Sequence, residues 1–147
     1  MKKSFYVALG LLLAASAFQT ARADDKARTL KVKVNYTGSG TVDDKHQIQV
    51  FVFDSPDFAQ GNAMPVGMQA TTSKTGSVTF AEIAKSPAYV AVVFDPTGGY
   101  DGQSGPPPSG SSIGMYTKEP PQPGAIEIAE GKTVEVEVAF DDSFKMP

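Results

Sequence analysis

One stretch of the sequence decides the fold: Tyr89-Val-Ala-Val-Val-Phe94, which runs directly into Asp95-Pro-Thr-Gly-Gly-Tyr-Asp101-Gly-Gln-Ser-Gly105. The first six residues are nearly all apolar and rich in valine. A run of this kind is typical of a strand that is covered on both faces. The residues that follow are turn formers, so the stretch predicts a central strand that ends in a loop with two carboxylates.

Other segments show the strand pattern, in which apolar and polar residues alternate along the chain. They cover residues 30–36, 47–53, 64–72, 77–80, 125–128 and 133–140, and residues 112–116 can add a short edge strand. Helical periodicity never exceeds about two turns, and residues 80–85 form at most one turn. Parallel α/β folds need helices between their strands. The sequence therefore predicts an all-β fold, a single antiparallel β-sandwich of about seven strands, transthyretin-like or immunoglobulin-like.

The first 23 residues have the pattern of a cleaved signal peptide. Lys2 and Lys3 form a basic start, residues 5–18 are apolar, and Ala21-Arg-Ala23 is a small-x-small cleavage site. The apolar segment is too short to span a bilayer comfortably, and no apolar segment of about 20 residues follows it. No cysteine lies near the cleavage site, which excludes a lipid anchor. We expect residues 24–147 to form one exported domain, in the periplasm or outside the cell.

Cysteine content and charge exclude several classes of function. The chain has no cysteine, which removes disulfides, thiol catalysis and cysteine-based metal sites. Loss of three positive charges with the signal peptide (Lys2, Lys3 and Arg22) takes the formal net charge from −3 to −6. An acidic surface repels nucleic acid and anionic lipid. We therefore expect neither nucleic-acid binding nor a membrane span.

Residues 96–124 depart from the strand pattern because they are dense in glycine, proline and serine. Gly105-Pro-Pro-Pro-Ser-Gly110 lies at the centre of this segment. A loop of this length in a small domain is uncommon and is either functional or disordered. Proline segments present a preformed surface to partners. The candidate contact residues are Tyr100, Pro106, Pro107, Pro108 and Tyr116, and the alternative is an exposed spacer without a partner.

A resemblance to known domains begins at Gly76-Ser-Val-Thr-Phe80-Ala-Glu-Ile83 and continues to Tyr89-Val-Ala-Val92. This segment resembles transthyretin-like and carboxypeptidase-regulatory-like β-sandwich domains, including small exported bacterial ones. Those domains usually have glycine just before the tyrosine, where this chain has Ser86-Pro-Ala88. The resemblance implies that Phe80 fills the core between two sheets. It also implies a binding, structural or accessory role without catalysis, and it carries over no active-site residue.

Asp95 and Asp101 are the best-placed carboxylates for a metal ion. Calcium takes several oxygen ligands, and a Gly-rich loop between two aspartates can supply backbone carbonyls and the Thr97 hydroxyl. An EF-hand-type loop needs acidic or amide side chains at alternate positions and a final glutamate. Thr97 and Gly99 occupy those alternate positions instead, and no glutamate follows. We favour a structural role, in which each aspartate caps its own turn, and keep calcium at Asp95 and Asp101 as the main alternative.

Copper binding and catalysis are two further alternatives. Copper would suit the one histidine and four of the methionines, which are His46, Met64, Met68, Met115 and Met146. Methionine more often fills gaps in a core. A Ser-His-acid arrangement is open in principle, but no Gly-x-Ser-x-Gly motif is present. We therefore do not expect an enzyme.

The sequence as a whole predicts a non-catalytic binding or structural module that acts through its sheet surface and the loop at 96–124. The partner would be a protein or a component of the cell envelope. Exposed edge strands allow self-association. The acidic pairs Asp43-Asp44 and Asp141-Asp142 are expected to be solvated surface charges.

Overall fold

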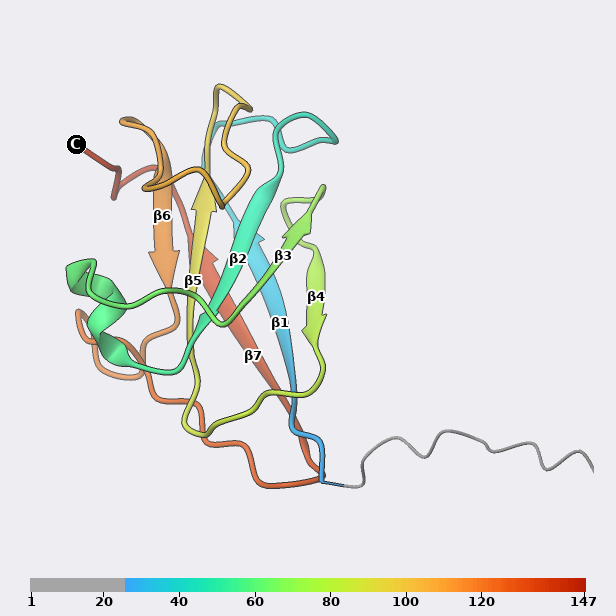
Figure 1. Ribbon diagram of the computed structural model, residues 1–147. Coiled ribbons are helices and arrows are strands. Elements are labelled where there is room, and N and C mark those ends of the chain that lie inside the picture. The colour runs from blue at the N-terminus through green and yellow to red at the C-terminus, as the bar shows by residue number, and fades with distance from the viewer. Residues whose placement is uncertain (1–25) are drawn as a thin grey trace, which may run out of the picture.

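The computed structural model describes residues 26–147, which form seven strands and one short 3-10 helix (Figure 1). The strands are β1 (Thr29–Tyr36), β2 (Ile48–Phe53), β3 (Gly67–Thr71), β4 (Ser77–Phe80), β5 (Tyr89–Phe94), β6 (Ser112–Met115) and β7 (Thr133–Phe140), and the 3-10 helix is η1 (Pro56–Gln60). The predicted all-β class is confirmed. Within residues 26–147, no helix has the length and apolar character needed to cross a membrane. The predicted signal peptide, residues 1–23, lies outside the described residues.

The strands form two sheets, one with the order β4-β1-β7 and one with the order β3-β2-β5-β6. Side chains from both sheets meet in one core, in which Leu30, Val50 and Val92 are fully buried. Phe80 also lies in this core, as the resemblance implied. Each fully buried aliphatic side chain contributes about 1.5–3 kcal/mol of transfer free energy. The two sheets therefore enclose a core between them, as in a sandwich.

The prediction of wholly antiparallel pairing is wrong for one pair of strands. β1 and β7 run parallel, with Leu30 opposite Val134 and Val34 opposite Val138. The other four pairs of strands are antiparallel. A parallel pair needs a long crossover connection, and here the chain from β2 to β6 supplies it without any α-helix. Local alternation cannot distinguish the two directions, because both bury every second residue.

One of the predicted strands differs from the structure. Residues 125–128 form a single bridge, between Ile126 and Ala88, rather than a strand. The edge strand expected at 112–116 is present as β6 and completes the count of seven. Residues 80–85 contain no helical turn; η1 provides the helical segment, with Ser55 Oγ accepting a hydrogen bond from the Asp57 backbone N–H at its start.

The outer face of the four-stranded sheet is also partly covered. Phe51, Phe53 and Val93 are buried there, away from the main core. Phe58 of η1 stacks on Phe53 with ring centroids 4.4 Å apart. Tyr100 covers Phe51 from the other side. This cover confirms that β5 is enclosed on both faces, as its continuous apolar sequence predicts.

Candidate functional site

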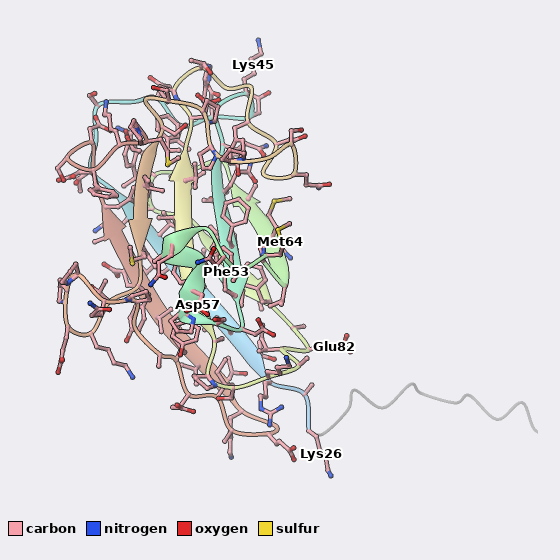
Figure 2. All side chains as sticks on the ribbon, turned by 60° about the vertical axis from the view of Figure 1, so that its left-hand side comes forward. Lys26, Lys45, Phe53, Asp57, Met64 and Glu82 are labelled. Atoms are coloured by element: carbon pink, nitrogen blue, oxygen red, sulfur yellow. The ribbon has the colours of Figure 1, made fainter. Side chains whose placement is uncertain are left out.

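The loops that join β1 to β2 and β5 to β6 lie at the same end of the sandwich (Figure 1), and Lys45 marks that end in Figure 2. Next to these loops, the outer face of β2 and β3 is hollowed to a volume of about 490 Å³. We call this cavity the polar hollow; its principal lining residues are Gln49, Met68, Ala70, Tyr100 and Asp101. Binding sites for small molecules commonly have volumes of about 300–1,000 Å³. The polar hollow is therefore large enough for a small ligand.

Gln49 is the buried polar residue of the polar hollow. β2 directs Ile48 and Val50 into the core, so Gln49 between them points to the outer face. The residue is only 7% exposed, and its partner across the ladder is the short side chain of Ala70. Within residues 26–147, the Gln49 amide makes no hydrogen bond. Among the described residues, the fully buried side-chain polar atom without a partner is Ser111 Oγ. The Gln49 amide remains accessible from the polar hollow, so this side chain is a candidate for binding.

Tyr100 forms an aromatic side of the polar hollow. Its hydroxyl donates to the Gly105 carbonyl at 3.2 Å, and its ring lies 6.4 Å from the Phe51 ring, measured between centroids. Gly102 lies against the Met68 side chain: a Cβ at position 102 would be 2.3 Å from the Met68 Sδ. The backbone of Gly102 also has a positive φ of +78°. Only glycine suits both the space and the backbone there. The loop after β5 is thus fixed closely against β2 and β3.

Asp95 holds the start of that loop in place. It is 5% exposed and accepts four hydrogen bonds: from the backbone N–H and hydroxyl of Thr97 at 2.8 and 2.7 Å, and from the backbone N–H groups of Gly99 and Tyr100 at 3.1 Å. Burial raises the pKa of Asp95, but the hydrogen bonds outweigh burial and leave the pKa below its usual value. The predicted turn-capping role is therefore what this carboxylate performs.

Asp101 caps the next turn in the same way. Its Oδ1 accepts the backbone N–H groups of Gln103 and Ser104, and its Oδ2 accepts the Ser104 hydroxyl at 2.8 Å. These hydrogen bonds, first that from Gln103, lower the pKa of Asp101. Both Asp95 and Asp101 line the polar hollow. In the described part of the chain, however, no group of three or more acidic or histidine side chains is placed to hold a metal ion.

The loop between β1 and β2 supplies the other side of the polar hollow. Asp43 Oδ1 accepts the backbone N–H groups of Lys45 and His46 and also lies 2.9 Å from the His46 Nδ1. Asp43 is therefore a turn-capping residue, and its pKa is lowered, chiefly by His46. The neighbouring Asp44 and Lys45 line the polar hollow with their side chains directed to solvent. His46 bonds to Asp43 alone among the described residues, and no hydroxyl contacts it as a nucleophile would.

The other residues predicted for partner contact lie away from the polar hollow. Pro106, Pro107 and Pro108 lie further along the loop and line neither this cavity nor its rim. Tyr116 follows β6 at the opposite end of the sheet, where its backbone N–H donates to Val90. Tyr100 and Tyr116 therefore do not flank one surface, because β6 carries the chain from one end of the sandwich to the other (Figure 1).

The methionines proposed for copper are dispersed over the surface and the sheet. Met64 is 82% exposed on the outer face (Figure 2), whereas Met68 packs against Gly102. Met115 lies in β6, and Met146 lies in the C-terminal segment that bonds to Ser111. His46 is held by Asp43. These positions do not form a common ligand set of the kind that copper needs.

Asp142 differs from the solvated surface charge that its sequence suggests. Its carboxylate accepts hydrogen bonds from the Tyr36 hydroxyl, from the backbone N–H and hydroxyl of Ser39, and from the Ser112 hydroxyl at 2.7 Å. The Tyr36 hydrogen bond is the main reason that the pKa of Asp142 lies far below its usual range. Asp142 thus joins β1, β6 and the end of β7, and the prediction of a free surface charge is wrong for this residue.

Gln49 is the site residue that the sequence alone does not single out. The signal was present, because a glutamine interrupts an otherwise apolar run in Ile48-Gln-Val-Phe-Val-Phe53. Alternation predicts only that it faces outward, where glutamine is normally solvated. It shares the cavity with Tyr100 and Met68, which come from other parts of the chain. No family model, curated protein or solved structure matches this chain, so the site is characterised by its own geometry.

Proposed function

We propose that the protein is a non-catalytic binding module that takes a small polar ligand in the polar hollow. The observation that carries this proposal is the Gln49 side chain, which lines the cavity and is only 7% exposed, and whose amide makes no hydrogen bond within residues 26–147 and so can pair with a molecule in the cavity. A ligand in the cavity can pair with this amide in place of water.

The rigidity of the surrounding loops supports a binding role. Asp95 and Asp101 together accept seven hydrogen bonds, all from residues of their own loop. These bonds hold Tyr100 in place before any ligand arrives. A preorganised site loses less conformational entropy on binding and is therefore tighter.

Export and the family resemblance enter the same proposal. We propose that a signal peptide at residues 1–23 directs the domain to the periplasm or the exterior, and that the fold is of the transthyretin-like kind. A binding or accessory module is the usual role of such domains. Calcium is less suitable for the polar hollow, because its two best carboxylates already accept hydrogen bonds from their own turns.

Solution NMR of the domain formed by residues 24–147 tests this proposal. We would record the side-chain amide signals of Gln49 while adding a library of small polar compounds. Binding in the polar hollow should shift the signals of Gln49 and Tyr100 together. Ala70→Phe should abolish these shifts by filling the cavity, whereas Thr79→Phe, an exposed position in β4, should leave them unchanged. Failure of every compound to shift Gln49, or shifts that persist in Ala70→Phe, would contradict the proposal.

A further inference from the structure

We propose that the ligand of the polar hollow is a neutral polyhydroxylated ring, that is, a sugar unit of a glycan. This inference rests on the proposed function and specifies its ligand class. It follows from three properties of the cavity: its charge, the chemistry of its hydrogen-bonding groups, and its aromatic side.

The charge of the polar hollow disfavours anions. Asp44, Asp95 and Asp101 line it, against the single positive charge of Lys45. Aligned negative charges in a cavity repel phosphate, carboxylate and sulfate groups. A small cation would need several free oxygen ligands, but all four carboxylate oxygens of Asp95 and Asp101 already accept hydrogen bonds within the loop. An uncharged ligand is compatible with both observations.

The hydrogen-bonding groups of the polar hollow suit hydroxyl groups. Gln47 and Gln49 lie on the outer side of the sheet and line the cavity, and each side-chain amide carries both donors and an acceptor. A hydroxyl group also donates and accepts, so neighbouring hydroxyls on one ring can pair with both amides at once. An apolar ligand would leave Gln49 unpaired and would bind poorly.

Tyr100 provides the flat surface that a sugar ring needs. One face of such a ring consists of C–H groups, which pack on the electron-rich face of an aromatic ring. The Tyr100 ring is half-buried and is held by its contact with Phe51 and its hydrogen bond to Gly105. An extended peptide presents its polar groups in a line, whereas those of the polar hollow converge from β2, from β3 and from two loops. A compact ring fits this arrangement better than a peptide.

Titrations with three classes of probe test the inference on the domain formed by residues 24–147. The first class contains methyl glycosides of glucose, galactose, mannose and N-acetylglucosamine and their short β- and α-linked oligosaccharides. The second contains calcium, spermidine and inorganic phosphate. The third is the blocked peptide acetyl-Gly-Ser-Gly-amide. The signals of Gln49 and Tyr100 report binding, and thermal melts check that each variant folds.

We expect at least one neutral glycoside or oligosaccharide to shift Gln49 and Tyr100. A larger effect of the oligosaccharide than of its methyl glycoside would identify a glycan chain rather than a free sugar as the source. Tyr100→Leu should weaken this binding at least about tenfold by removing the ring. Tyr100→Phe keeps the ring and should change the affinity less than about threefold, and so should the distant Thr79→Phe.

The alternative outcomes separate the two proposals. If the charged probes or the peptide shift the Gln49 signals and none of the sugars does, the glycan inference is overturned while the proposed binding site is retained. Sugar binding that Tyr100→Leu and Ala70→Phe do not weaken would also overturn it. If no probe of any class shifts Gln49, both the glycan inference and the proposed function are wrong.

Discussion

Replacing Gln49 by methionine should stabilise the protein while weakening ligand binding. Methionine has nearly the same length and volume, so the packing around position 49 is retained. The change removes an amide that makes no hydrogen bond among residues 26–147 and belongs to a residue that is only 7% exposed. A fully desolvated group of this kind would cost about 1–3 kcal/mol. Because the amide keeps some access to solvent through the polar hollow, we expect the lower end, a gain of about 1 kcal/mol in the free energy of unfolding.

The expected gain corresponds to a measurable rise in melting temperature. An entropy of unfolding of about 2.1 cal/mol/K per residue, applied to roughly 120 residues, converts 1 kcal/mol into about 4 °C. Differential scanning calorimetry and urea unfolding of Gln49→Met against the wild type would measure it. Gln69→Met is the matched control, because Gln69 is exposed on β3 and should change stability by less than about 0.5 kcal/mol. A loss of 1 kcal/mol or more in Gln49→Met would refute the reasoning, since it would mean that the amide has a partner in the folded protein.

Three further predictions concern the interactions that hold the loops and the outer face. Asp142→Asn should destabilise the protein by about 2 kcal/mol at pH 7, because it disrupts hydrogen bonds to a charged group. Asp141→Asn should have a small effect, because among the described residues the Asp141 carboxylate bonds only to the nearby Ser143. The pKa of Asp142 is lowered in the folded state, so the carboxylate stabilises the fold above the unfolded pKa of about 4, and this stabilisation is lost as the pH falls further. Urea unfolding across pH 2–7 should therefore show the stabilities of the wild type and Asp142→Asn converging in acid. A difference in stability that stays constant with pH would contradict this account. Phe58→Ala should lower the free energy of unfolding by about 2 kcal/mol, since Phe58 is half-buried and stacked on Phe53. A loss below about 0.5 kcal/mol in chemical unfolding would show that η1 does not stabilise the outer face. Millimolar calcium or EDTA should shift the melting temperature by less than about 1 °C, because the Asp95 carboxylate is already bonded within its own loop; a stabilisation that grows with calcium concentration would favour the metal alternative.

The sequence predicts the strands better than it predicts their partners. The alternating residues of β1 and β7 and the continuous apolar run of β5 identify these elements directly. Their parallel pairing depends on residues about a hundred positions apart in the sequence, such as Leu30 and Val134. Periodicity within a strand carries no information about direction. The same limit applies to Ile126, which forms only one bridge, to Ala88, while the Ile128 N–H donates to the Ser86 hydroxyl.

The candidate site shows the same division between local and distant interactions. The turn-capping role of Asp95 follows from the Pro-Thr-Gly-Gly sequence after it, because all of its hydrogen-bond donors lie within five residues. Asp142 could not be interpreted in this way, since its main partner, Tyr36, is 106 residues away. Gln49 likewise lines a cavity whose aromatic side, Tyr100, comes from a loop far along the sequence. Sequence patterns misassign the residues whose roles depend on contacts with residues far away in the sequence.

The central claim is that a ligand pairs with Gln49 in the polar hollow. The most direct test is an isotope-filtered NMR measurement of contacts between the bound ligand and the protein, made with the tightest-binding neutral oligosaccharide from the titrations. Our account predicts contacts from sugar ring protons to the Gln49 side-chain amide and to the Tyr100 ring. Contacts instead to Pro106–Pro108 or to Tyr116, with none to Gln49, would place binding elsewhere on the protein and would contradict it.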